Sequence, residues 1–106
     1  MSSSDEVAKK IDALWQTYLP TMVVRMAAIQ LAIESLEAGH FDRELTRNAA
    51  LEAHKLAGSL GTFGLASSSG MSSRIENLLS LPESVQGMVV ELRRLFDSVS
   101  RDIESR

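Results

Sequence analysis

The 106-residue chain has no cysteine, only two prolines and only two histidines. Without cysteine it can form neither a disulfide framework nor a thiolate zinc site, and this composition fits a reducing compartment. Two histidines alone make a poor metal site, so we expect no bound metal. The net charge of −3 provides no basic footprint for nucleic acid and no polybasic patch for a membrane surface.

Long apolar runs and a leader sequence are also lacking. No run approaches the roughly 20 apolar residues that a membrane helix needs. The first residues, MSSSDEV, have neither the basic nor the apolar region of a signal peptide. We therefore expect a soluble, cytoplasmic protein without membrane insertion. Hydrophobic residues make up 44% of the chain, which is typical of a folded protein, and the length fits one domain over residues 1–106.

Apolar residues recur at helical spacing almost everywhere, and the alternation typical of strands is nearly absent. The pattern predicts a short helix before Pro20, a second from Pro20 to a stop at Gly39, a third after Asp42, a fourth from near Leu65, and a last one after Ser80-Leu81-Pro82-Glu83. Proline suits a first helical turn, aspartate an N-cap and glycine a helix end. The expected fold is all-α, an antiparallel four-helix bundle with an additional short N-terminal helix.

A histidine and several glycines stand inside the third predicted helix, in the stretch AHKLAGSLGTFGL. His54 lies two residues before Leu56 of the core stripe, so at about 100° per residue it points well away from the core. Leu51, Gly58 and Gly61 share its face, because helical neighbours recur every three or four residues. Each interior glycine costs roughly 1 kcal/mol relative to alanine. A partner that must come close to the imidazole would explain that cost.

An exposed imidazole is largely neutral at physiological pH, and its free nitrogen lone pair can act as a nucleophile. A phosphoramidate formed there is reactive enough to pass its phosphoryl group on, if a partner brings the metal and the acceptor carboxylate. Two simpler interpretations stay open at this point. His54 can be an ordinary surface residue, and the glycines can serve tight helix packing or mark a helix end near Gly61.

Five residues of this stretch resemble the signature of histidine-containing phosphotransfer (HPt) domains, roughly H-x-L-K-G-S-x-x-x-x-G. In register with it are His54, Leu56, Gly58, Ser59 and Gly64. The GTFG sequence inside the stretch is also similar to the phospho-accepting domain of chemotaxis histidine kinases. The all-helical layout predicted for the whole chain agrees with the four-helix bundle of this family.

The resemblance implies that His54 carries a phosphoryl group in a two-component phosphorelay, between receiver-domain aspartates or from a histidine kinase. The partners would be response-regulator receiver domains, a sensor histidine kinase, or both. The protein would be a phosphocarrier rather than an autonomous kinase, because its glycines follow no strand and form no phosphate-binding loop. It would need no cofactor of its own, since the magnesium ion would belong to the receiver.

The resemblance also implies roles for residues around His54. Family members often carry a glutamate in a ϕ-E-x-L-L pattern on the next helix, which the sequence IENLL fits, so Glu76 is expected to orient the imidazole through its other nitrogen. Gly58 would give the receiver close access. The remaining residues expected to dock the partner are Leu51, Lys55, Gly61 and Arg47.

One position departs from the family pattern. Where the family usually has a lysine, three residues after the histidine, this chain has Ala57. Lys55 is the nearest cation in the sequence, but adjacent helical residues diverge by about 100°. The departure weakens the case for phosphoryl stabilisation inside the carrier, and it leaves the nucleophile in place.

Two rival functions are compatible with the same residues. The bundle could be a docking module that binds a receiver or kinase through Leu51 and Gly58 without accepting phosphate. Alternatively, it could be an enzyme in which His54 acts as a general base. Such an enzyme usually needs an orienting carboxylate and a pocket, and Glu76 is the only candidate carboxylate that the sequence offers.

Overall fold

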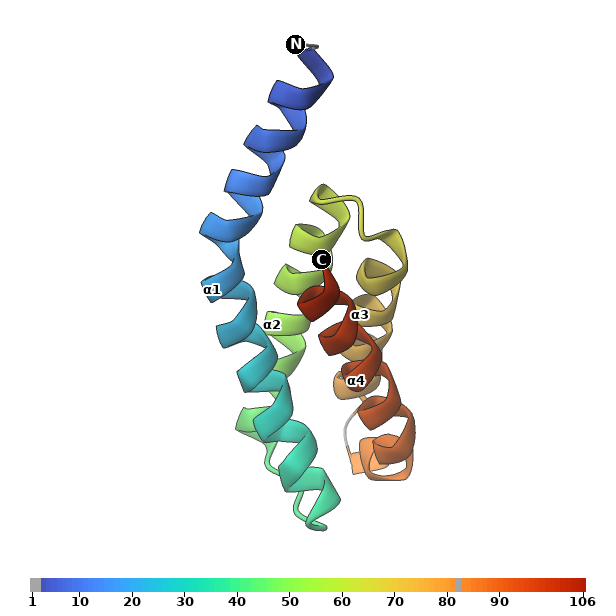
Figure 1. The fold of residues 1–106 in the computed structure, drawn as a ribbon. Coiled ribbons are helices and arrows are strands. Elements are labelled where there is room, and N and C mark those ends of the chain that lie inside the picture. The colour runs from blue at the N-terminus through green and yellow to red at the C-terminus, as the bar shows by residue number, and fades with distance from the viewer. Residues whose placement is uncertain (1–2, 82) are drawn as a thin grey trace.

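The computed structural model describes residues 3–81 and 83–106, and these residues are almost entirely helical (Figure 1). The elements in chain order are α1 (Ser3–Glu37), α2 (Arg43–Thr62), α3 (Ala66–Leu79), the 3₁₀ helix η1 (Glu83–Met88) and α4 (Val89–Ser105). Strands are absent from the described residues. The prediction of an all-α four-helix bundle is confirmed.

Helix α1 runs without a break through Pro20, so the separate short N-terminal helix that we predicted from this proline is wrong. Trp15 before the proline and Met22 after it both belong to the buried core, and the inward stripe of α1 keeps its phase across this point. Pro20 itself is exposed on the far side of the helix. Proline removes one helical hydrogen bond and its ring crowds the carbonyl four residues earlier, so the helix continues through Pro20 at a cost that the buried residues on both sides offset.

The 35 residues of α1 span about 52 Å at 1.5 Å per residue, nearly the 56 Å long axis of the molecule. By length and composition α1 could cross a membrane, so the expectation that no apolar run is long enough is wrong. One third of its apolar window, 33%, is buried inside the bundle. The core helix of a soluble protein passes the same test.

The ends of α1 and α2 follow the predicted signals. Gly39 adopts a left-handed conformation with φ of 83°, and its N–H donates to the carbonyl of Leu36. This closes α1 in the way that glycine does best. Asp42 caps α2, because its Oδ1 accepts hydrogen bonds from the N–H groups of Glu44 at 3.0 Å and Leu45 at 3.1 Å.

The last helix begins later than the sequence suggests. The 3₁₀ helix η1 precedes α4, which starts only at Val89. Gly87 within η1 has a low helix propensity, which favours this delay. The side chain of Gln86 ties η1 to the end of α1 by donating to the carbonyl of Leu36 at 2.6 Å. Pro82, which we expected in the first turn of this helix, lies outside the described residues.

The core consists of apolar side chains that all four helices direct inward. The Ser69 hydroxyl of α3 donates to the carbonyl of Ala57 on α2 at 2.7 Å, and the buried Ser68 hydroxyl donates to Asp102 of α4 at 2.6 Å. The core residues are Trp15, Met22, Met26, Ile29, Ala32, Ile33, Leu36, Ala49, Ala53, Leu56, Leu60, Ile75, Leu78, Leu79, Leu92, Phe96, Val99 and Ile103.

A bidentate ion pair joins α4 to the end of α1. Arg93 donates from Nη2 to Glu37 Oε1 at 2.7 Å and from Nε to Glu37 Oε2 at 2.9 Å, and its Nη1 donates to Gln30 at 2.8 Å. Hydrogen bonding to Arg93 holds the pKa of the Glu37 carboxyl below its ordinary value. Arg93 is therefore part of an inter-helix clamp rather than only a solvated charge on α4.

Replacing Pro20 by alanine should stabilise the protein. Pro20→Ala restores a helical hydrogen bond at an exposed position, so we expect the free energy of unfolding in urea to rise by about 1–3 kcal/mol. Thr21→Ala, at the exposed neighbouring position, controls for the gain from alanine itself. An unchanged or lower stability of Pro20→Ala would show that this proline costs α1 nothing.

The Glu37–Arg93 pair should contribute stability that depends on pH. Because the pKa of Glu37 is lowered in the folded state, its contribution is present above the ordinary value of 4.5 and is lost as the pH falls through the folded pKa. Glu37→Gln should therefore be less stable than wild type near pH 7, by less than about 1 kcal/mol for this half-exposed pair. Urea unfolding from pH 7 to pH 3 should show the two curves converging, and a constant difference would contradict this origin.

Candidate functional site

His54 stands on the outward face of α2, with 71% of its side chain exposed to solvent. Leu56, two residues later, is completely buried in the core, as the helical spacing predicted. On the same outward face Leu51 is 57% exposed. The rigid core thus fixes the backbone of α2 while the imidazole remains accessible.

Glu76 reaches His54 from α3. The Nδ1 atom of His54 lies 3.1 Å from Oε1 of Glu76, so the structure brings together the histidine and the glutamate that the sequence motifs singled out. A carboxylate only accepts hydrogen bonds, which favours the proton on Nδ1. The lone pair of the other nitrogen, Nε2, is then available to a reacting group.

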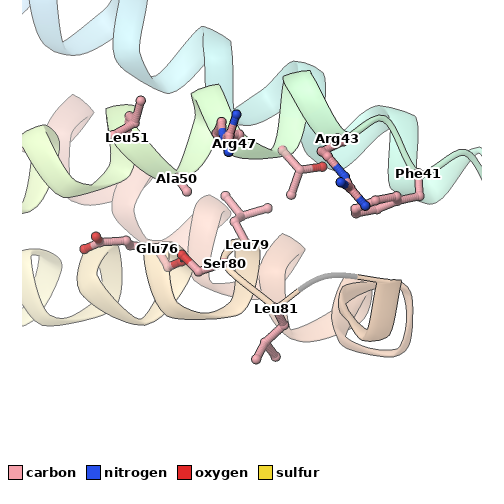
Figure 2. A pocket seen from close by; sticks show the side chains of 10 residues that line it. Phe41, Arg43, Arg47, Ala50, Leu51, Glu76, Leu79, Ser80 and Leu81 are labelled. Atoms are coloured by element: carbon pink, nitrogen blue, oxygen red, sulfur yellow. The ribbon is translucent and has the colours of Figure 1, made fainter.

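One hollow, of about 500 Å³, lies between α2 and α3 beside this pair (Figure 2). Arg47 and Leu51 from α2 and Glu76 from α3 all line it, so three predicted site residues share this surface. Sequence reasoning missed Arg43, which lies one helical turn before Arg47 and could have been found from that spacing. The other lining residues are Phe41, Thr46, Ala50, Leu79, Ser80 and Leu81.

A second hollow, of about 990 Å³, lies on the other side of His54, between α2 and the N-terminal half of α1. Lys55 and Gly58 line it from α2, and Ile11, Leu14 and Tyr18 line it from α1. No sequence pattern indicated this hollow, because the helical spacing of the α1 residues equally fits a buried stripe. Tyr18 in particular is 48% exposed rather than part of the core.

The three glycines after His54 have different surroundings. A Cβ atom added to Gly58 would meet nothing within 4 Å, so packing does not require glycine there. A Cβ on Gly61 would lie 3.3 Å from the hydroxyl oxygen of Ser69 on α3, so this glycine does serve helix packing. Gly64 has φ of 78° and follows the end of α2 at Thr62. The packing interpretation therefore fits Gly61, and the helix end belongs to Gly64.

The cations near His54 are partly neutralised. Lys55 lies 3.4 Å from Glu52, which also pairs with Arg25 of α1 at 3.6 Å. Arg25 in turn donates to the hydroxyl of Ser59 at 3.0 Å. Sequence reasoning missed Arg25 and Glu52. Ala57, at the position of the usual lysine, is only 8% exposed and faces the contact with α3.

Over residues 3–81 and 83–106, no group of three or more histidine, cysteine, aspartate or glutamate side chains comes together in a way that could hold a metal ion. The arrangement of His54 and Glu76 is that of an exposed imidazole with a carboxylate at Nδ1, which leaves Nε2 free to accept or release a group.

Comparison with protein families gives one match. The family model described as "Hpt domain" matches residues 13–102, a span that includes His54 and Glu76 and reaches into all four helices. Comparisons with curated proteins and with solved structures gave no match.

Replacing Gly58 by alanine should raise the stability of α2 and reduce the access of a partner to His54. Gly58→Ala has open space around its Cβ and should stabilise α2 by about 1 kcal/mol, while placing a methyl group beside the imidazole. We expect urea unfolding to show the gain and receiver binding to weaken. Gly61→Ala is the matched control, because its Cβ would press on Ser69 and should give little or no gain. Unchanged receiver binding by Gly58→Ala would contradict the role of Gly58 as an access residue, and a loss of stability would contradict the open space around its Cβ.

Proposed function

Because the chain belongs to the Hpt domain family, whose members are phosphocarrier modules, we propose that it carries a phosphoryl group on His54 in a two-component phosphorelay. The observation that supports this most is the exposed imidazole whose Nδ1 faces Glu76 at 3.1 Å. It combines a solvent-accessible nucleophile with a group that directs the reactive lone pair outward. A residue that exchanges a group with a second protein needs both properties.

The proposed transfer needs no base beyond the imidazole itself. The Nε2 lone pair attacks the phosphorus of an aspartyl phosphate on the receiver, the N–P bond forms, and the P–O bond breaks with its electron pair returning to the carboxylate. The proton stays on Nδ1, where the Glu76 carboxylate stabilises the positive charge that develops on the ring. Transfer to the next receiver is the reverse of this step. The receiver supplies the magnesium ion, and this chain contributes no cofactor.

The proposed docking surface surrounds His54 on α2. Leu51 offers an apolar contact and Gly58 leaves room for the partner, whereas the Cβ position of Gly61, also expected in this surface, is turned to Ser69 of α3. Arg47 and Lys55 supply positive charge on either side. Hpt domains interact with receiver domains and histidine kinases, and this surface suits a receiver whose active site is acidic. We expect the carrier to work in the cytoplasm as a non-enzymatic module.

The side chains at positions 57 and 55 favour a second function, that of a docking module. Ala57 is packed against α3 where the family usually has a lysine, and Lys55 is engaged with Glu52. A carrier whose cations are occupied stabilises a phosphoryl group less well. The same surface would then serve as a docking module that binds a receiver without accepting phosphate.

Label transfer from a phosphorylated receiver domain tests the proposal. Wild type should acquire an acid-labile, base-stable label, and His54→Gln should stay unlabelled while still binding the receiver. His40→Gln is the matched control, because His40 is the other histidine and is exposed between α1 and α2. Glu76→Gln should slow labelling by roughly tenfold without weakening binding, because the imidazole loses its orienting charge.

Other outcomes would contradict the relay or one part of it. A wild-type protein that binds several receivers but is never labelled would support the docking module. A label that survives in His54→Gln would place the phosphoryl group on another residue. Equal labelling rates for Glu76→Gln and wild type would remove the orienting role while leaving the carrier function intact.

A further inference from the structure

The outer face of α1 carries a second, exposed stripe of apolar and small residues. Its members follow one another at alternating spacings of four and three residues, and all are exposed: Ala13, Thr17, Pro20, Val24, Ala27 and Leu31. Val24 is 68% and Leu31 56% exposed. Alternating steps of four and three residues are the pattern by which two helices pack along a common seam. We call these six residues the outer seam.

The outer seam points away from the rest of the bundle. It lies on the side of α1 opposite the core residues Met22 and Ile29, and Figure 1 shows α1 along one side of the molecule. Between positions 13 and 31 the only charged residue is Arg25, and its side chain turns to Glu52 and Ser59 of α2. The uncharged face is about 27 Å long at 1.5 Å per residue.

We propose that the outer seam binds a second copy of this chain in an antiparallel arrangement. If the twofold axis crosses the seam at the level of position 22, each seam residue meets a complementary one. Ala13 faces Leu31, Thr17 faces Ala27, and Pro20 faces Val24. Small Ala13 thus opposes the larger Leu31, small residues meet in the Thr17–Ala27 layer, and Pro20 packs against Val24 next to the axis.

The charges at the two ends of the seam select the same register. The next positions of the 3.5-residue repeat are Lys10 on one side and Glu34 on the other, and both are exposed. In the antiparallel register Lys10 of one copy faces Glu34 of the other, twice per dimer. In a parallel pair, lysine would face lysine and glutamate would face glutamate, which is unfavourable. Charge complementarity therefore identifies a second copy as the occupant.

A dimer formed in this way leaves His54 accessible, because α2 lies on the other side of α1, and it does not depend on the proposed phosphotransfer. A membrane surface fits the outer seam less well, since no ring of basic residues borders it. Two helix faces of this length bury on the order of 1,000 Å² in total, at the low end of specific interfaces. We therefore expect a reversible dimer with a micromolar dissociation constant.

Analytical ultracentrifugation from low micromolar to several hundred micromolar protein tests the proposal. Wild type should shift from monomer to dimer, and Val24→Lys should raise the dissociation constant at least tenfold. Val90→Lys is the matched control, because Val90 is an exposed valine, 82% accessible, on α4. Circular dichroism of each variant verifies that the helices remain folded.

A charge exchange tests the register. Lys10→Glu alone and Glu34→Lys alone should each weaken the dimer, and the double variant should restore it. Because the chain has no cysteine, Thr17→Cys with Ala27→Cys should also give an oxidised dimer linked between copies. A protein that stays monomeric throughout, or that binds lipid vesicles instead, would overturn the proposal. A dimer that the charge exchange does not restore would overturn the antiparallel register.

Discussion

The contact between α2 and α3 is the constraint on which the candidate site depends. Small side chains make it close, since Gly61 faces Ser69, and the Ser69 hydroxyl bonds to the backbone of α2 at Ala57. This spacing determines how far Glu76 stands from His54. A larger residue at the contact would separate the helices and lengthen the 3.1 Å approach of the carboxylate to the imidazole. The packing of two helices therefore sets the geometry of a histidine side chain that is itself 71% exposed.

The three glycines after His54 have three different physical roles. Gly58 leaves open space at the surface, Gly61 leaves room for a neighbouring helix, and Gly64 adopts a backbone conformation that other residues avoid. In the sequence all three look alike, at spacings of three residues. Only the surroundings of each Cα distinguish access from packing and from helix termination.

Sequence reasoning predicted the bundle because its signals are local. Helical spacing, the cap at Asp42 and the stop at Gly39 each act within one or two turns of helix. The proximity of His54 and Glu76 also followed from two short motifs on successive helices. Pro20 misled the prediction, because whether a proline ends a helix depends on what packs around it. Burial of Trp15 and Met22 on both sides held α1 together.

Features that join distant parts of the chain could not be predicted in this way. The clamp between Glu37 and Arg93 spans 56 residues, and nothing in either segment indicates the other. The hollow beside Lys55 and Gly58 is also lined by Ile11 and Leu14 of α1, the helix that extends past its neighbours at the N-terminal end (Figure 1). Such features are properties of the assembled bundle, and they follow from the relative positions of helices rather than from the helices themselves.

The placement of His54 determines how the phosphorylated and unphosphorylated forms of the carrier would differ. The residue sits in the middle of a helix whose inner side is packed, and its side chain is hydrogen-bonded to Glu76. A group attached at Nε2 would project into solvent without displacing a backbone atom or a core side chain. In the proposed relay, the loaded and empty carriers would thus share one shape and differ in surface charge alone. A receiver would distinguish the two forms by their electrostatic potential, and phosphorylation would not need to change the conformation of the carrier.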